Sequence, residues 1–308
     1  MSLDPQIAAV LQQFSSMPQP DYSQLDPQQY RQFCDNLMPP MPGEAVFEVR
    51  NLRLAGAECE LDARLYRPED RHDLPLLVFF HGGGFVIGNL DTHDNLCRSL
   101  ARLTGAVVVS VAYRLAPEHR FPAAPHDCYR ATCDLVERAR ELGFDASRLA
   151  LAGDSAGANL AIAVSRLAQI RKGPRIACQC LFYPAVDARC DSASQQEFAE
   201  GYFLTREQMQ WFWRQYLPRP EQVDDPLASP LRAEDLAGLP PTTLFSAEYD
   251  PLRDEGEVFA RRLQQSGVKT RLERCAGMVH GFVSMAAFVD GARGVLESAA
   301  ADLRHALN

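Results

Sequence analysis

The sequence predicts an α/β fold, with a mostly parallel sheet of eight strands flanked by helices and a helical cap. Residues 76–80 and 106–109 are apolar without polar alternation. Continuous apolar strands are typical of a sheet that is covered on both faces, and such sheets are mostly parallel. From about residue 44 onward, strand patterns also alternate with amphipathic helix patterns. This order of elements is that of a doubly wound sheet.

The strand patterns form a series whose first two members differ from the rest. Segments 45–50 and 59–66 alternate more between polar and apolar residues than the later ones do, so we expect them to form an antiparallel edge. The expected strands are 45–50, 59–66, 75–80, 106–111, 148–153, 178–183, 242–247 and 269–274. Helices are expected between them at 124–142, 157–171 and 254–266, and at the C-terminus.

Two segments stand outside this alternation and predict the cap. In residues 1–43, Asp4 and Asp26 are each followed by proline, which is typical of an N-cap and the first helical position. Helices are therefore expected at 5–15 and 27–37. The second segment is a long insertion at residues 189–227.

In the insertion, Thr205 and Gln208 match a capping box that opens a helix ending at Tyr216. One face of this helix is apolar at positions i, i+3, i+4 and i+7, and Trp211 points elsewhere. The residues of that face are Met209, Phe212, Trp213 and Tyr216. We expect residues 1–43 and 189–227 to form the cap together.

The composition excludes several classes of partner. The chain of 308 residues has 31 basic and 40 acidic residues, a net charge of −9, so nucleic acid and anionic membranes are unfavourable partners. No apolar run approaches the roughly 18 to 20 residues that cross a bilayer, and no signal peptide is visible. Nine scattered cysteines, with no pair at zinc-site spacing, predict reduced thiols in the cytoplasm. We expect no metal and no cofactor.

Ser155 is the strongest candidate for a nucleophile. It lies between an apolar strand and the start of a helix, in Gly153-Asp154-Ser155-Ala156-Gly157. A strand-to-helix turn this tight strains the serine backbone and requires very small residues two positions away on each side. The hydroxyl is then held at the rim of the sheet, near the positive end of the following helix. The structural alternative is an ordinary turn between strand and helix.

A run of glycines follows the strand at 75–80. Such a run lets backbone N–H groups turn toward one point, where a developing oxyanion could be held. Gly83 and Gly84 are the expected donors, with Ala156 as the third. A flexible turn and a dinucleotide-binding loop are the alternatives, although the glycine spacing is one residue too long for the latter. We expect His81 to be structural.

His280 is the best candidate for a general base and Asp250 for the acid that orients it. His280 follows the strand at 269–274 after a short loop, and Asp250 follows the strand at 242–247. Loops at one edge of the sheet can bring both to the serine. Asp254 is the alternative acid. The other histidines are expected to be structural, at 119 and 126, or on the surface, at 72, 93 and 305.

These motifs together resemble the hormone-sensitive-lipase-like branch of the α/β-hydrolases, which includes bacterial carboxylesterases. The resemblance covers the chain from about residue 75 and includes His81-Gly82-Gly83-Gly84-Phe85, Tyr113-Arg114-Leu115-Ala116-Pro117-Glu118, Phe121-Pro122-Ala123-Ala124, Gly153-Asp154-Ser155-Ala156-Gly157, Asp250-Pro251-Leu252-Arg253-Asp254-Glu255-Gly256 and His280-Gly281-Phe282. It implies a Ser155, Asp250 and His280 triad, oxyanion donors at Gly83, Gly84 and Ala156, and a cap made from the N-terminus and the late insertion. We expect the catalytic domain to comprise residues 44–188 and 228–308.

The expected function is that of a cytoplasmic carboxylesterase that hydrolyses short- to medium-chain esters through an acyl-serine intermediate. The substrate would be a small molecule, and both a monomer and a homodimer remain open. The expected substrate-binding residues are Phe85, Trp211, Phe212, Trp213 and Phe282. The cap aromatics could instead only pack the cap onto the sheet. Amide or formamide hydrolysis by the same triad and a small-molecule receptor are the alternative functions.

Overall fold

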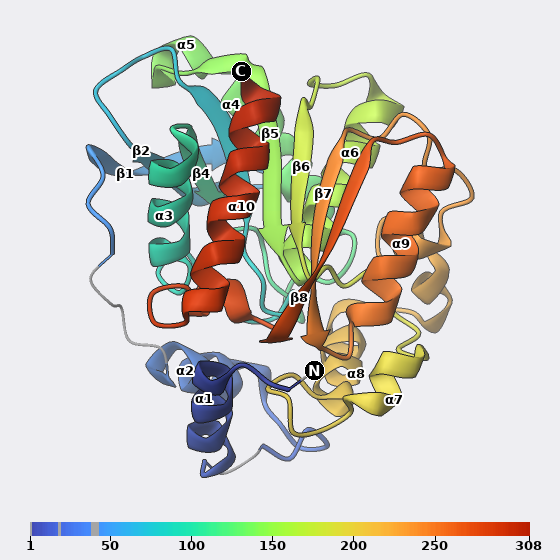
Figure 1. The fold of residues 1–308 in the computed structure, drawn as a ribbon. Coiled ribbons are helices and arrows are strands. Elements are labelled where there is room, and N and C mark those ends of the chain that lie inside the picture. The colour runs from blue at the N-terminus through green and yellow to red at the C-terminus, as the bar shows by residue number, and fades with distance from the viewer. Residues whose placement is uncertain (1, 18–19, 38–42) are drawn as a thin grey trace.

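The computed structural model describes residues 2–17, 20–37 and 43–308, and a single sheet runs through its centre (Figure 1). Within these residues the sheet has eight strands in the order β1-β2-β4-β3-β5-β6-β7-β8. β2 pairs antiparallel with both β1 and β4, and all other neighbours are parallel. The predicted fold class and antiparallel edge are confirmed. The strands are β1 (Glu48–Ala55), β2 (Glu60–Arg67), β3 (Pro75–Phe80), β4 (Val107–Val111), β5 (Asp145–Asp154), β6 (Cys178–Phe182), β7 (Thr242–Tyr249) and β8 (Thr270–Val279).

Helices cover both faces of the sheet. α3 and α10 pack on one face, and α4, α6 and α9 pack on the other. The α-helices are α1 (Pro5–Ser15), α2 (Pro27–Leu37), α3 (Asp94–Thr104), α4 (Ala123–Glu137), α5 (Ala139–Leu142), α6 (Ala156–Arg171), α7 (Ala193–Glu197), α8 (Arg206–Tyr216), α9 (Arg253–Gln265) and α10 (Asp290–Leu307). Short 3-10 turns are η1 (Pro220–Asp224), η2 (Pro230–Arg232) and η3 (Phe282–Met285). Among the described helices, none combines the length and the apolar composition that crossing a bilayer requires.

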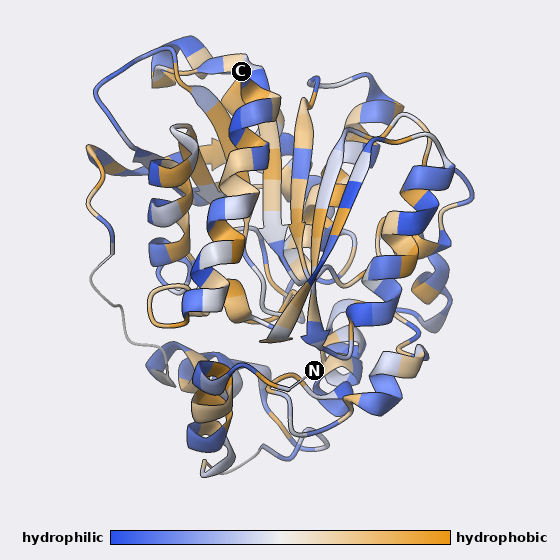
Figure 2. Cartoon of the chain, in the orientation of Figure 1, coloured by the Kyte–Doolittle hydropathy of each residue, from blue (hydrophilic) through white to orange (hydrophobic). Residues whose placement is uncertain are grey.

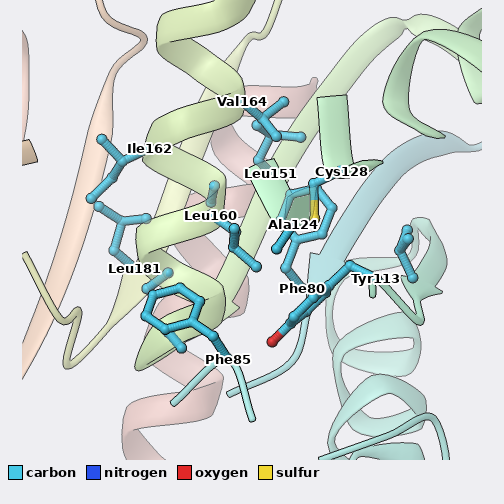
Figure 3. Close-up of a cluster of buried hydrophobic side chains, with 14 of the residues drawn as sticks. Phe80, Phe85, Tyr113, Ala124, Cys128, Leu151, Leu160, Ile162, Val164 and Leu181 are labelled. Carbon is cyan, nitrogen blue, oxygen red and sulfur yellow. The ribbon is translucent and has the colours of Figure 1, made fainter. Parts of the chain in front are cut away.

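The apolar run in β3 follows from its position between two layers of helices. Phe80 belongs to the core on the α4 and α6 side, whereas Phe79 belongs to the core on the α3 and α10 side. Because successive side chains of a strand point to opposite faces, both faces demand apolar residues. Figure 3 shows Phe80 with Leu151 of β5 and Leu160 of α6 in the first of these cores. Figure 2 shows that the central strands are largely hydrophobic, whereas the helices carry both hydrophobic and hydrophilic residues.

α3 was not predicted, although its sequence carries two helix signals. Leu96, Leu100 and Leu103 repeat at helical spacing, and Gly105 ends the helix with a left-handed φ of 68°. The helix begins without a side-chain cap, because its N-cap residue is His93, whose side chain makes no bond to the helix. The sequence therefore gives no capping signal for the start of this helix.

Several other boundaries differ from the expectation. The first strand runs from Glu48 to Ala55 rather than over 45–50. β8 continues to Val279 across a register irregularity opposite β7, so the loop expected before His280 was wrong, and His280 directly follows the strand. The helix expected at 124–142 is divided into α4 and α5 at Arg138.

The two N-terminal helices begin as the sequence predicts. The Asp4 carboxylate accepts the N–H groups of Gln6 and Ile7, and Asp26 caps α2 in the same way. α8 begins at Thr205, which accepts the N–H of Gln208 at 3.1 Å. The expected capping box is only half formed there, because the Gln208 amide donates to the hydroxyl of Tyr30 in α2 at 2.6 Å. In Figure 1, α1, α2, α7 and α8 lie at the same end of the sheet.

Candidate active site

Ser155 lies on the sharp turn between β5 and α6. Its φ of 54° and ψ of −118° are strained values for a residue with a side chain. A Cβ atom at Gly153 would overlap the backbone of Gly157, and one at Gly157 would overlap the carbonyl of Phe80. Both glycines are therefore required, as the sequence suggested, because the chain passes so closely here.

His280 and Asp250 meet Ser155 at the ends of two neighbouring strands. The Oγ of Ser155 lies 2.9 Å from Nε2 of His280, and Nδ1 of His280 lies 2.8 Å from Oδ2 of Asp250. A carboxylate can only accept, so Nδ1 carries the hydrogen and Nε2 is free to accept from the serine hydroxyl. The other oxygen of Asp250 accepts the N–H of Leu252 at 2.8 Å. The three residues predicted as a triad thus form one hydrogen-bonded series.

This series is largely shielded from water. Asp250 is fully buried, and Ser155 and His280 are 7% and 6% exposed. Hydrogen bonds of a charged group are stronger in such surroundings than at the surface. The arrangement can therefore remove a proton from the serine and hold the imidazolium that results.

The alternative acid, Asp254, is bonded elsewhere. Its carboxylate accepts the N–H of Ser194, in α7, at 2.9 Å and pairs with the adjacent Arg253. Glu248 likewise accepts the N–H of Gly277 at 2.8 Å. The geometry therefore favours Asp250 as the partner of His280.

The glycine loop after β3 has the backbone freedom that only glycine offers. Gly83 and Gly84 have φ values of 115° and 58°, and the carbonyl of Gly83 accepts the N–H groups of Val86 and Ile87. Within the part of the chain that the structure describes, the N–H groups of Gly83 and Gly84 have no protein acceptor. Ala156 is the first residue of α6, where an N–H has no acceptor within the helix. The assignment of these three groups as oxyanion donors stays a prediction.

The loop does not open a helix, which separates it from a dinucleotide-binding loop. The next helix, α3, begins only at Asp94. His81 is buried and stacks on Tyr113 with 4.4 Å between ring centroids. Burial, together with the nearby His93, lowers the pKa of His81 to about 4, so its ring is neutral near pH 7.

The expectation that His93 is a surface residue was wrong. Its side chain is buried, and its Nε2 lies 3.3 Å from Oδ1 of Asp154. Burial would raise the pKa of Asp154, but the attraction of His93 and the N–H of Gly82 outweigh it, so the pKa lies below its ordinary value. Sequence reasoning singled out neither residue for a function. The available signal was an aspartate at the end of an apolar strand, because a buried carboxylate requires partners.

The predicted substrate-binding aromatics are all buried. Phe212 lies directly against Gly84, since a Cβ atom there would overlap its ring. Phe85 stacks on Tyr216 with 3.8 Å between centroids. Three further contacts are Trp213 with Phe85 at 5.3 Å, Trp211 with Tyr30 at 5.5 Å, and Phe282 with Tyr183 at 5.3 Å. Of the five, Phe212 is thus in contact with a predicted oxyanion donor, and substrate binding by the set stays a prediction.

Comparison with known proteins shows the family of the chain. Residues 77–284 match the family model described as the alpha/beta hydrolase fold. Carboxylic ester hydrolase LipN of Mycobacterium tuberculosis is 43% identical over 80% of this chain and 67% of its own length. The arylesterase of Saccharolobus solfataricus is 37% identical over 92% of this chain and 93% of its own length. A solved hyperthermophilic esterase from Pyrobaculum calidifontis superposes with a TM-score of 0.95 at 40% identity, covering 100% of both chains. The resemblance drawn from the motifs is confirmed, and the chain belongs to the α/β hydrolase fold family.

Proposed function

We propose that this protein is a serine carboxylesterase that hydrolyses short- to medium-chain carboxylic esters through an acyl-serine intermediate. The observation that carries the proposal is the hydrogen-bonded series from Ser155 through His280 to Asp250, with its distances of 2.9 and 2.8 Å. The names of the relatives add support, because they include a carboxylic ester hydrolase, an arylesterase and, in Pseudomonas putida, an ethyl acetate hydrolase that is 42% identical over 75% of this chain and 74% of its own length.

In the acylation half of the proposed mechanism, Nε2 of His280 takes the proton of the Ser155 hydroxyl as Oγ attacks the ester carbonyl. The tetrahedral oxyanion accepts hydrogen bonds from the N–H groups of Gly83, Gly84 and Ala156. When the intermediate collapses, the bond to the alcohol breaks, and the departing oxygen takes the proton from Nε2. Asp250 stays ionised throughout, holding the ring in one orientation and stabilising the imidazolium.

Deacylation repeats these steps with water in place of the serine. His280 removes a proton from water, which attacks the acyl carbonyl, and the same three N–H groups hold the second oxyanion. The bond to Oγ then breaks, Ser155 regains its proton and the carboxylic acid departs. Each donor to the oxyanion contributes on the order of 10²–10³ to the rate. No step of this scheme calls for a cofactor.

We further propose that residues 1–43 and 189–227 form a cap that walls the substrate site of the catalytic domain, 44–188 and 228–308. Of the N-terminal part, residues 1, 18–19 and 38–42 lie outside the described residues. The support is the contact between α2 and α8. The amide of Gln208 donates to the Tyr30 hydroxyl at 2.6 Å, and the ring centroids of Tyr30 and Trp211 lie 5.5 Å apart. The proposed substrate-binding residues are Phe212, Phe85, Trp211, Trp213 and Phe282. An apolar wall of this kind suits a small, uncharged ester.

The proposed location is the cytoplasm. The support is that all nine cysteines are free, as expected for reduced thiols. Fractionation of cells that express the chain at its natural level would test this, and recovery with secreted proteins would contradict it.

The test of the activity is a substrate panel with the wild-type protein and Ser155→Ala. We expect turnover of short-chain p-nitrophenyl esters, weaker activity on matched amides, and a loss of roughly 10⁴–10⁶ in kcat for the variant. Ser165→Ala is a matched control, because Ser165 is a buried serine of α6, the helix that follows Ser155, and its hydroxyl donates to the side chain of Gln179. Unchanged turnover in Ser155→Ala, or amide turnover above ester turnover, would contradict the proposal.

A further inference from the structure

A buried carboxylate joins the turn at Ser155 to the glycine loop. Oδ1 of Asp154 accepts the N–H of Gly82 at 2.8 Å, although the two residues are 72 positions apart in the chain. Nε2 of His93, at the start of α3, lies 3.3 Å from the same oxygen. Asp154 and His93 are 5% and 9% exposed. A buried charge persists only with such partners, so this contact is a built feature of the fold.

Both nitrogens of the His93 ring have polar partners. Asp154 as a carboxylate only accepts, so this 3.3 Å contact is attractive when Nε2 carries a hydrogen and points it at Asp154. Nδ1 lies 2.9 Å from Oγ1 of Thr92, a hydroxyl that accepts the N–H of Asn89 and donates to the Asn89 carbonyl. Both ring nitrogens are therefore engaged, and the orientation of the imidazole is fixed.

The contact with Asp154 controls one peptide unit of the loop. The carbonyl of His81 and the N–H of Gly82 belong to the same planar peptide group. The Tyr113 hydroxyl donates to the carbonyl at 2.7 Å, and Asp154 accepts from the N–H. With both polar atoms held, the plane of this peptide cannot rotate. A Cβ atom at Gly82 would moreover collide with the Asp154 carboxylate, so the two are in direct contact.

We propose that His93 is a positioning residue for ester hydrolysis: it donates from Nε2 to Asp154 and so holds the carboxylate where it accepts from Gly82. The fixed peptide then sets the direction of the next two N–H groups, those of Gly83 and Gly84, toward the oxyanion. The inference rests on the proposed function. Because these donors act on the transition state more than on the bound substrate, losing His93 lowers kcat and leaves KM nearly unchanged.

Two variants of His93 with similar chemistry form the test. In His93→Gln the amide nitrogen extends to about the position of Nε2 and can still donate to Asp154. In His93→Asn the amide is one carbon shorter and reaches only the position of Nδ1, beside Thr92. We expect His93→Asn to lose about 10- to 100-fold in kcat, at most the effect of one oxyanion donor, with KM within about threefold. His93→Gln should recover most of that loss.

Leu100→Ala is the control for a general loosening of α3. Leu100 is a buried residue of the same helix and belongs to the core under the sheet. If a variant of this kind with an equal fall in Tm loses as much kcat as His93→Asn, the effect is structural and the inference is overturned. A double-variant cycle with Asp154→Ala gives a second criterion. Adding His93→Asn to Asp154→Ala should cost less than about twofold, since interacting residues are not additive, and a full multiplicative loss would contradict the proposal.

Amide hydrogen exchange separates this inference from the proposed function. In His93→Asn, the Gly82 amide should exchange faster than in the wild type, while His93→Gln and Leu100→Ala leave it protected. This result does not depend on any activity. If the wild type hydrolyses no ester, the proposed function fails and the exchange data alone decide the role of His93 in the loop. Unchanged exchange at Gly82 in His93→Asn overturns the inference whatever the kinetics show.

Discussion

Arg31 connects the N-terminal helices to the rest of the fold, and its ion pair predicts a measurable pH dependence. Its guanidinium donates to Glu118 at 2.6 and 2.8 Å and to the carbonyls of Val86 and Ala116 at 2.6 and 2.5 Å. The hydrogen bond from Arg31 lowers the pKa of Glu118 from 4.5 to about 2. We predict that Glu118→Gln loosens α2 without unfolding the sheet.

The size of this effect follows from the shift and the exposure. Without solvent screening, this pKa shift of Glu118 would correspond to about 3 kcal/mol of stabilisation. The Glu118 side chain is 39% exposed, so solvent screening reduces the contribution to about 1 kcal/mol. This corresponds to roughly a fivefold change in the opening equilibrium of α2. Since the pKa of Glu118 is lowered on folding, the stabilisation is present above about pH 4.5 and is lost as the pH falls toward about 2.

The assay is hydrogen exchange of the α2 amides, corrected for the intrinsic rate at each pH. At pH 7, α2 should exchange about fivefold faster in Glu118→Gln than in the wild type, and the gap should narrow between pH 5 and pH 3. Glu137→Gln is a matched control, because Glu137 pairs with Arg130 on α4. Equal protection of α2 in Glu118→Gln and wild type at pH 7, or a gap that widens on acidification, would refute the reasoning.

Two further predictions concern the site. Asp250→Asn should lower kcat by about 10⁴, because an amide at this position favours the wrong tautomer of His280, and Asp254→Asn should have a far smaller effect in the same ester assay; the reverse order would show that the acid was misassigned. Gly157→Ala should abolish activity and lower Tm, because its Cβ would overlap the Phe80 carbonyl, which is backbone and cannot rotate away; a crystal structure of an active Gly157→Ala protein would contradict this.

Local patterns were sufficient to predict much of the site. The sharp turn that holds Ser155 could be predicted, because the need for small residues at Gly153 and Gly157 is a property of the turn itself. Asp250 could be located because it directly follows an apolar strand, β7. His280 was found although the end of β8 was placed too early, since either boundary leaves it at the same edge of the sheet.

Features that depend on distant partners could not be predicted in this way. His93 is a polar residue with no local signal of burial. Its burial follows from its contact with Asp154, at the end of β5. The half-formed capping box at Gln208 has the same cause, because Tyr30 competes for its side chain. α3 was missed because its N-cap position holds His93, which is not one of the residue types that mark the start of a helix in a sequence.

The central claim is that the Ser155 hydroxyl is activated by His280, and covalent labelling tests it most directly. Intact mass and peptide mapping after incubation with a fluorophosphonate should find one adduct, on Ser155, that forms far more slowly in His280→Ala. The absence of an adduct, or labelling of Ser155 at the same rate in wild type and His280→Ala, would contradict the account.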